Sequence, residues 1–357
     1  MRIVLFVGRL AVGGGEKVLT MIANHLAAHG SEVDIVTLLG SEVDREHFHL
    51  NEHIDIIDLH PIRNKAYYLN ALYWLKKIRG VVKSRRPDIV ISFFGRINAL
   101  VLTATIGMHV PIIVSERNDP KRDGRGKMML KYCDLIYRRA SAIVFQTRYE
   151  QSCFSCAHSS CRYIIPNPIE IIDIPKIPVD ENLIVSVGRL EHQKNHIMLV
   201  KAVEVIKTKI PNVRCEIYGE GSLCGELQKQ IDEGGMENTI VLKGKKDNIL
   251  GHMAKGKVLV MTSDYEGLSN ALMEAMMIGK VCVSTNYDGV EDLIKNGENG
   301  MIVPRNDAFR LAEVLTDILL EKSEKYDELG KNARNSILAY SSQNIMSQWI
   351  GLINSLI

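Results

Sequence analysis

The chain has 357 residues, of which 46% are hydrophobic and 24% charged, with a formal net charge of +2. This length exceeds one ordinary domain and suits two domains of about 150 to 180 residues each. No apolar run approaches the roughly 20 residues that a membrane span needs, which predicts a cytoplasmic protein, at most attached peripherally to the inner face of the cell membrane. Seven cysteines, an odd number, indicate a reducing compartment rather than a disulfide framework.

The N-terminal segment predicts a βαβ unit with a glycine-rich loop. Residues 2–7 predict a buried strand, the periodicity over 16–29 predicts a helix, and 33–38 predict a second strand. The sequence GRLAVGGG connects the first strand to the helix, and its glycines allow the backbone to approach a ligand closely. Because the register of Gly14 and Gly15 does not match G-x-G-x-x-G, a dinucleotide oxidoreductase is disfavoured. An ordinary glycine-rich turn is the alternative.

The next unusual segment, residues 61–86, is strongly basic, with eight basic residues and no acidic one. Its apolar and aromatic side chains recur on one face of a predicted helix, which suits an anionic membrane surface or a polyanionic acceptor such as a lipid diphosphate. A helix that packs on a sheet with its lysines in solvent is the alternative. Residues 121–139 add seven basic residues to two acidic ones, and no recognised motif for nucleic acid accompanies this charge, so a nucleic acid partner is not expected. The predicted apolar face consists of Tyr68, Leu72, Leu75 and Val82.

Three more strands complete the first half, at residues 88–93, 112–115 and 142–146, and the last of these is expected to be its final strand. The polar loop after the second of them contains Arg117 and Asn118. This loop lies at the carboxyl end of a strand, where binding residues are common. Both residues are therefore candidates for the site, with an ordinary polar turn as the alternative.

A short cluster of cysteine and histidine follows. The spacing C-x-x-C-x-H-x-x-C offers four possible ligands, but structural zinc sites usually join two ligand pairs across a longer loop. We therefore expect no metal site here, and we expect free thiols in a loop or helix. The four residues are Cys153, Cys156, His158 and Cys161.

Four prolines between residues 166 and 178 predict an extended linker. A strand at 183–187 then restarts the α/β pattern and runs into GRLEHQKN, which places Arg189 and Lys194 just beyond a strand end and near a helix that starts around Asn195. Two cations at that position can neutralise the charge that grows on a leaving diphosphate. Two surface cations are the alternative. A later strand ends in a glycine turn at Gly219, which can approach a nucleotide closely.

The most informative stretch is SDYEGLSNALMEAMMIGKVCVST, residues 263–285. It predicts a strand end, a loop, a short helix capped by Ser269 or Asn270, and another buried strand. In open parallel sheets such a loop faces a ligand. Amides at the start of the helix suit an anion such as a diphosphate, and Glu266 and Glu274 suit hydroxyl groups on either side of it; two glutamates in solvent are the alternative. The candidate amides belong to Gly267, Leu268, Ser269 and Asn270.

Four ordered features resemble the retaining glycosyltransferases of family 4, the glycosyl transferases of group 1. They are the N-terminal glycine loop, GRL followed by KN, the glutamate pair within EGLSNALMEAM, and the turn-rich segment STNYDGVEDLIKNGENGMIVP. The resemblance implies the α/β GT-B fold, in which two doubly wound, Rossmann-like domains face each other across a cleft. It implies an acceptor-binding domain at residues 1–165, a linker at 166–180, a nucleotide-sugar-binding domain at 181–340, and a helix that crosses back to the first domain at 341–357.

The resemblance also assigns roles within the site. Glu274 would hold the ribose hydroxyls and Glu266 the hydroxyls of the donor sugar, while Arg189 and Lys194 would hold the diphosphate. Glu266, Arg189 and Lys194 are thus the expected catalytic residues. The chain contains no Asp-x-Asp sequence, which agrees with protein cations acting in place of a divalent ion, so no metal and no further cofactor are expected. Donor contacts are also expected at Gly14, Gly15, Gly219 and Gly244.

Within the family, EGLSNALMEAM and the basic helix are most similar to bacterial enzymes that extend polyprenyl-diphosphate-linked oligosaccharides with N-acetylgalactosamine. This similarity implies transfer of a hexose or N-acetylhexosamine from a nucleotide sugar, with UDP favoured over GDP, to a glycan or lipid-linked acceptor of cell-surface polysaccharide or glycoprotein assembly. The lipid diphosphate would lie against Lys76, Lys77, Arg79 and Lys83.

Three questions stay open at this point. Many family members carry a histidine in the loop near the reacting sugar, and SERNDP has none, so Arg117 or Asn118 is a candidate replacement. A nucleotide-sugar epimerase on the same fold is one alternative function. A non-catalytic homologue that docks at membranes through its positive face is the other.

Overall fold

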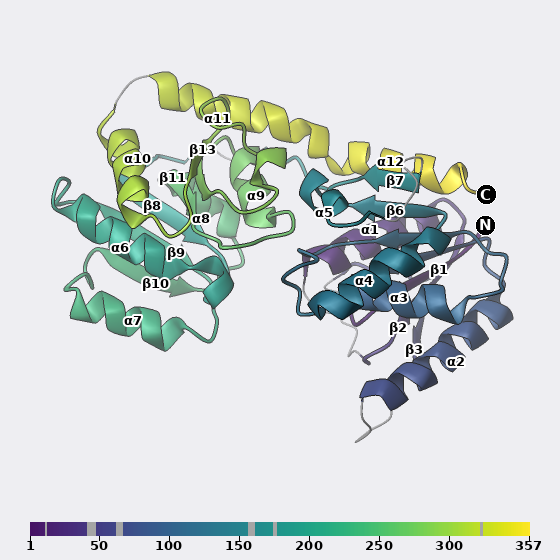
Figure 1. Ribbon diagram of the computed structural model, residues 1–357. Coiled ribbons are helices and arrows are strands. Elements are labelled where there is room, and N and C mark those ends of the chain that lie inside the picture. The colour runs from purple at the N-terminus through teal and green to yellow at the C-terminus, as the bar shows by residue number, and fades with distance from the viewer. Residues whose placement is uncertain (11–12, 41–47, 62–66, 156–160, 174–176, 322–323) are drawn as a thin grey trace. The chain divides into compact units, whose positions relative to one another are not determined.

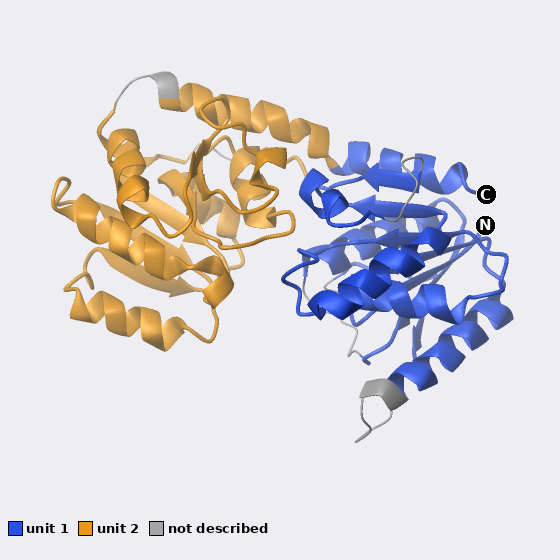
Figure 2. Ribbon diagram, in the orientation of Figure 1, with its two compact units in different colours: residues 1–168, 342–357 blue, residues 169–341 orange. Residues whose placement is uncertain are grey.

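The computed structural model describes residues 1–10, 13–40, 48–61, 67–155, 161–173, 177–321 and 324–357. The chain forms two compact units (Figure 2). Unit 1 comprises residues 1–168 together with 342–357, and unit 2 comprises residues 169–341. None of the helices in these described segments is long and apolar enough to cross a membrane.

Unit 1 is built on a seven-stranded parallel sheet with the strand order β3-β2-β1-β4-β5-β6-β7. Its central strands are almost continuously buried, as expected for parallel strands that are covered on both faces. The strands are β1 (Arg2–Val7), β2 (Glu32–Thr37), β3 (Ile54–Asp58), β4 (Ile89–Phe93), β5 (Ile112–Ser115), β6 (Ala142–Phe145) and β7 (Arg162–Ile164).

Helices cover both faces of this sheet (Figure 1). One face packs against α1 and α12, whose apolar stripes include Ile22 and Trp349. The other face packs against α2, α3 and α4, which bury Trp74, Leu102 and Cys133. The helices of unit 1 are α1 (Gly14–Ala28), α2 (Tyr67–Arg85), α3 (Gly95–Ala104), α4 (Gly126–Ile136), α5 (Arg148–Ser152) and α12 (Ser342–Asn354).

Unit 2 repeats this architecture on a six-stranded parallel sheet with the order β10-β9-β8-β11-β12-β13. Helices α6, α7 and α10 pack on one face, and α8 and α9 pack on the other, together with the C-terminal half of α11. The strands are β8 (Asp180–Val187), β9 (Arg214–Tyr218), β10 (Ile240–Gly244), β11 (Gly256–Met261), β12 (Val281–Thr285) and β13 (Met301–Val303). The helices are α6 (His196–Lys207), α7 (Cys224–Glu233), α8 (Ile249–Lys255), α9 (Asn270–Met277), α10 (Ala308–Leu320) and α11 (Glu324–Ile337).

Both units share one feature of strand order that positions ligands. In each sheet the first strand lies between the second and the fourth, so the direction in which strands are added reverses at β1/β4 and at β8/β11. Ligands of open parallel sheets bind at the carboxyl ends of the strands beside such a switch point. The two doubly wound parallel sheets confirm the predicted α/β fold class.

Three short strands were not predicted from the sequence. They are β3, β7 and β13, of five, three and three residues. The expectation that residues 142–146 form the final strand of the first half is wrong, because β7 pairs with β6 just before the linker. β7 and β13, of three residues each, carry too little periodicity to separate them from loops.

The predicted apolar face of α2 is also partly wrong. The buried stripe consists of Trp74, Ile78 and Val82, spaced four residues apart, whereas the side chain of Leu72 is 64% exposed. Leu75 is half-buried, and the side chain of Tyr68 lies outside the described residues. The large indole of Trp74 lies on the buried side of this helix, and a count of apolar residues gives it no more weight than a leucine.

Candidate functional site

Two loops meet at the β8/β11 switch point of unit 2. The first loop follows β8 and includes the short 3-10 helix η3 (His192–Lys194), and the second follows β11 and leads into α9. The hydroxyl of Thr262 donates to the carbonyl of Lys194 at 2.9 Å, and the amide of Asp264 donates to the carbonyl of Gln193 at 2.8 Å. These bonds fix the two loops against each other.

Within this junction, Glu266 and Lys194 form an ion pair. The ammonium of Lys194 lies 2.6 Å from Glu266 Oε1, and the side chains are only 13% and 10% exposed. The hydroxyl of Ser263 donates to the same oxygen at 2.6 Å, and Gln193 Nε2 lies 3.4 Å from the other. The structure therefore brings together two of the three residues that were predicted to be catalytic.

The third residue, Arg189, lies in the same loop but is exposed. Its guanidinium donates to Gln193 Oε1 at 3.2 Å, and Gln193 in turn donates to the carbonyl of Tyr265 at 2.8 Å. Arg189 is thus linked to Glu266 through one side chain. Sequence reasoning missed Gln193 and Ser263, although each lies within three residues of a predicted site residue.

The start of α9 is built as the sequence predicts. Ser269 is the N-cap, and its hydroxyl accepts a bond from the amide of Leu272 at 3.4 Å. The following residues are buried against the sheet, and Gly279, with φ of +73°, lies just beyond the end of the helix. The first amides of a helix have no intrahelical partner and lie at the positive end of its dipole. Gly267 and Leu268 precede this cap, and Glu274 is half-buried one turn inside the helix.

Gly219 lets the loop after β9 pass close to the loop after β8. It has φ of +142°, and a side chain there would collide with the carbonyl oxygen of Gly188. The amide of Gly219 donates to the carbonyl of Gly244 at 3.0 Å, and Gly244 has φ of +66°. Gly221 likewise passes against the backbone of Leu190. Glycines are thus needed here for the β9 loop to support the β8 loop.

His196, the first residue of α6, is buried near the charge of Lys194 and was also missed. It is 4% exposed and borders a pocket of about 220 Å³ shared with Asn195 and Asp264. Burial, and to a smaller extent the nearby charge of Lys194, together lower the pKa of His196 to about 4. The imidazole is therefore neutral at physiological pH.

This shift predicts a loss of stability in acid. The unfolded chain binds the proton near pH 6.5 and the folded chain only near pH 4, so the contribution of His196 is complete above about pH 6.5 and decreases as the pH falls toward 4. Between about pH 7 and about pH 4.5 the wild type should lose about 2 to 3 kcal/mol that a His196→Gln variant does not lose. Urea unfolding of both proteins at both pH values measures this difference. An equal loss in the two proteins would contradict it.

In unit 1, the glycine loop leads into α1 at the β1/β4 switch point. Gly14 is the first residue of α1, and a side chain at Gly15 would collide with the ring of Phe94. The carboxylate of Glu16 folds back against Gly13, and burial raises the pKa of Glu16. Residues 11 and 12 of the predicted loop lie outside the described residues.

The two candidates in the loop after β5 have different surroundings. Arg117 is 5% exposed, and its guanidinium lies 5.1 Å from the ring of Phe93 and 5.5 Å from that of Trp349. It donates to Ser115 Oγ at 2.8 Å and to Asn167 Oδ1 at 3.1 Å, and burial lowers its pKa to about 10. Asn118, in contrast, is exposed. The structure thus makes Arg117 an anchor for α12 rather than an accessible acceptor contact.

The four basic residues of α2 that were predicted to bind the acceptor also have different surroundings. Lys76, Lys77 and Lys83 are exposed, and the ammonium of Lys77 lies 5.5 Å from the centre of the Tyr73 ring. Arg79 instead donates to the carbonyls of Ala104 and Ile106, each at 2.8 Å. These carbonyls are at the end of α3, so Arg79 caps that helix and ties it to α2.

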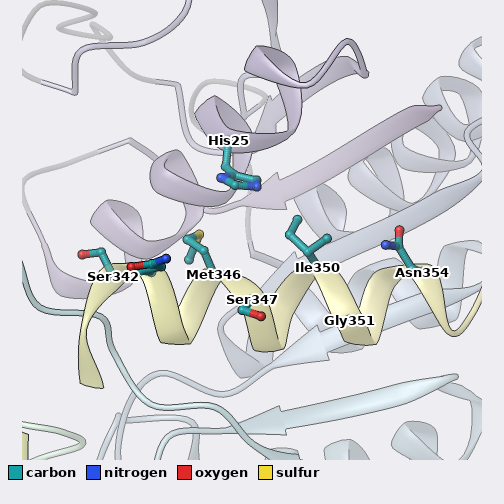
Figure 3. A pocket seen from close by; sticks show the side chains of 8 residues that line it. His25, Ser342, Met346, Ser347, Ile350, Gly351 and Asn354 are labelled. Atoms are coloured by element: carbon teal, nitrogen blue, oxygen red, sulfur yellow. The ribbon is translucent and has the colours of Figure 1, made fainter. Parts of the chain in front are cut away.

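Two further features lie away from the predicted residues. A pocket of about 660 Å³ lies between α1 and α12, and Figure 3 shows His25 pointing from α1 toward it. None of the predicted site residues lines this pocket. Of the cysteine and histidine cluster, Cys156 and His158 lie outside the described residues, and the residues that are described contain no group of His, Cys, Asp or Glu arranged to hold a metal ion.

Comparison with known proteins gives matches along most of the chain. The family model "Glycosyl transferases group 1" matches residues 169–336, and "Glycosyltransferase Family 4" matches residues 12–171. A Campylobacter jejuni protein, GalNAc-alpha-(1->4)-GalNAc-alpha-(1->3)-diNAcBac-PP-undecaprenol alpha-1,4-N-acetyl-D-galactosaminyltransferase, is 28% identical over 99% of this chain and 98% of its own.

A second Campylobacter jejuni relative, N-acetylgalactosamine-N,N'-diacetylbacillosaminyl-diphospho-undecaprenol 4-alpha-N-acetylgalactosaminyltransferase, is 26% identical over 90% of this chain and 92% of its own. Among solved structures, Anabaena Alr3699/HepE in complex with UDP superimposes with a TM-score of 0.83 over 99% of this chain and all of that one, at 17% identity. At this identity, the superposition supports the fold alone.

Proposed function

Since the chain belongs to the glycosyl transferases of group 1 and family 4 and is a glycosyltransferase with the GT-B fold, we propose that it transfers a hexose or N-acetylhexosamine from a UDP-sugar to a lipid-diphosphate-linked glycan. The observation that carries this proposal is the Lys194–Glu266 ion pair, 2.6 Å long, at the β8/β11 switch point. The pair places a cation and a hydroxyl acceptor next to the start of α9, where an anion is favoured.

The donor is proposed to bind unit 2 through its diphosphate. Lys194 and the exposed Arg189 supply two positive charges, and the start of α9 from Gly267 supplies backbone amides. A diphosphate that reaches Lys194 shares its ammonium with Glu266, whose carboxylate then accepts a bond from a hydroxyl of the donor sugar. Glu274 is proposed to bind the ribose hydroxyls.

In the reaction, the bond between the anomeric carbon and the diphosphate breaks while the acceptor oxygen attacks from the same face, so the configuration is retained. The acceptor proton passes to the departing diphosphate oxygen. Lys194 and Arg189 stabilise the negative charge that grows on that oxygen, because fixed charges in a partly dry site need no reorganisation as the reaction proceeds. In this proposal the two protein cations take the place of a divalent metal ion.

Two observations support the nature of donor and acceptor. The name of the Anabaena complex includes UDP, and the names of both Campylobacter jejuni relatives include an undecaprenol diphosphate acceptor. The exposed Lys76, Lys77 and Lys83 of α2 are proposed to bind the acceptor's diphosphate. In this proposal the chain attaches to the inner face of the cell membrane, where it reaches a lipid-linked acceptor. Arg79 is not part of this proposal, because it caps α3.

The experiment that tests this function measures nucleotide release from a panel of UDP- and GDP-sugars, with and without a bacterial lipid extract that contains polyprenyl-diphosphate sugars. We expect release from one UDP-sugar that depends on the extract. Conversion of a UDP-sugar without extract would establish the epimerase alternative instead. Binding of UDP with no turnover under either condition would favour a non-catalytic homologue.

The role of Glu274 has its own test. A Glu274→Ala variant should bind UDP about 1 to 3 kcal/mol more weakly than wild type, because the ribose hydroxyls lose their acceptor. Isothermal titration with UDP measures this change. Glu328→Ala is the matched control, since Glu328 is an exposed glutamate of α11 in the same unit. If both variants bind UDP like wild type, Glu274 does not contact the nucleotide.

A further inference from the structure

Helix α4 of unit 1 has apolar side chains on both of its faces. Its inner face buries Cys133, next to Tyr137 just beyond the helix end. On the outer face, Met128 is 87% exposed, Tyr132 38% and Leu135 60%. The spacing of four and three residues places these three side chains in one stripe. Three large apolar side chains gathered on two turns of a surface helix indicate a binding surface.

Cations border this stripe. Lys127 and Lys131 on α4 are exposed, as are Arg138 and Arg139 directly after it. The one acidic residue of the helix is Asp134, which accepts bonds from the amide and hydroxyl of Ser155 at 2.7 and 2.8 Å. The carboxylate of Asp123, just before the helix, is held by Arg125. The outer face of α4 therefore combines apolar side chains with an excess of positive charge.

The same combination continues on the neighbouring helices. Helices α2, α3 and α4 lie side by side over one face of the sheet (Figure 1). The hydroxyl of Tyr132 lies 2.6 Å from that of Thr103 on α3, which joins the outer surfaces of α3 and α4. Ile106, just beyond the end of α3, is 50% exposed, and Leu72 on α2 is 64% exposed. Helix α2 carries the exposed Lys76, Lys77 and Lys83 in addition to Leu72.

We propose that the outer face of α4 inserts into the interface of an anionic lipid bilayer, with Met128 and Leu135 below the headgroups. Apolar side chains with a border of lysine and arginine are typical of helices that lie in the membrane surface, where burial of apolar area and attraction to anionic lipids add together. The inference deepens the proposed function by assigning the membrane contact to α4, and vesicle binding tests it without any sugar substrate.

The test measures binding of the full chain to vesicles of phosphatidylethanolamine and phosphatidylglycerol by co-sedimentation. A Met128→Ser, Leu135→Ser double variant should bind about tenfold more weakly than wild type, because two apolar side chains leave the bilayer. Phe309→Ser is the matched control: Phe309 on α10 is 73% exposed but lies among Asp307 and Glu313. This control should bind vesicles like wild type.

A second measurement reports on insertion directly. The native tryptophans, Trp74 and Trp349, are buried, so a Leu135→Trp variant adds one exposed indole. Its fluorescence should shift to the blue on anionic vesicles and be quenched by brominated lipid, while that of Phe309→Trp should not change. Both variants should unfold in urea at the same midpoint as wild type, which shows that the substituted units are folded.

Two outcomes would overturn the inference. One is unchanged vesicle binding by the double variant together with an indole at position 135 that brominated lipid does not quench. The other is a double variant that changes the oligomeric state while vesicle binding stays constant, which would identify the stripe as a contact between copies of the chain. Failure of the sugar-transfer assay does not affect either result, so the two proposals are tested separately.

Discussion

Replacing Lys194 with methionine should lower the turnover number by about a hundredfold to a thousandfold, the range for losing one preorganised electrostatic contact to a developing charge. The ammonium of Lys194 lies 2.6 Å from Glu266 and is nearly buried, so its charge is weakly screened. The stem of the lysine packs over Gly188, and methionine retains most of that contact. The affinity for the donor should change less than turnover, because the charge to be stabilised is largest as the bond to the diphosphate breaks.

The matched control is Lys201→Met. Lys201 is an exposed lysine of α6, a few residues along the chain, and its replacement removes the same charge from unit 2 without touching the loop junction. The control should keep turnover within about twofold of wild type. Equal activity of wild type and Lys194→Met would remove Lys194 from the catalytic group, and equal losses in both variants would point to a general charge effect.

Replacing Arg125 with methionine should destabilise unit 1 by about 3 to 5 kcal/mol, because it leaves the carboxylate of Glu116 buried without its partner. The guanidinium bonds both oxygens of Glu116, at 2.9 and 2.6 Å, and the side chains are 1% and 0% exposed. Tyr137 donates to the same carboxylate. Burial lowers the pKa of Arg125, but the charge of Glu116 and the hydrogen bonds to Glu116 and Asp123 together outweigh burial, so the net shift is upward. A side chain at Gly95 would collide with this guanidinium.

Denaturant unfolding, followed by a probe in unit 1 such as Trp74, measures this loss. Arg139→Met is the matched control, since Arg139 is an exposed arginine of the same unit and its replacement should cost about 1 kcal/mol or less. A Glu116→Leu, Arg125→Met double variant should recover part of the loss, because the uncompensated charge is gone. A single Arg125→Met variant as stable as the control would refute the account of this network.

The fold follows from local patterns in the sequence. Apolar runs bounded by glycine and polar loops predict β1 and β5 with the bounds that the structure has, and Ser269 and Gly279 limit α9 as predicted. The loops beyond β8 and β11 could be placed at one edge of a sheet, because parallel strands put their carboxyl ends together. That placement is what joins Lys194 to Glu266, over 70 residues apart in the sequence.

The remainder depends on partners distant in sequence. Arg117 is buried against Trp349, which lies more than 200 residues later, and no pattern within SERNDP indicates this contact. Arg79 fits the pattern of a basic surface helix, yet its guanidinium donates to carbonyls at the end of α3. Gln193 bonds Tyr265 and Glu266 from a loop that pattern analysis treats as a spacer. A residue's charge can be read from the sequence, but the group that satisfies that charge cannot.

The measurement that tests the central claim most directly is the mass of a purified polyprenyl-diphosphate-linked acceptor before and after incubation with the chain and a UDP-sugar. The account predicts that the acceptor gains one or more sugar residues, at a rate that falls strongly in Lys194→Met and stays constant in Lys201→Met. An acceptor of unchanged mass, in a reaction where the UDP-sugar is consumed or epimerised, would contradict it.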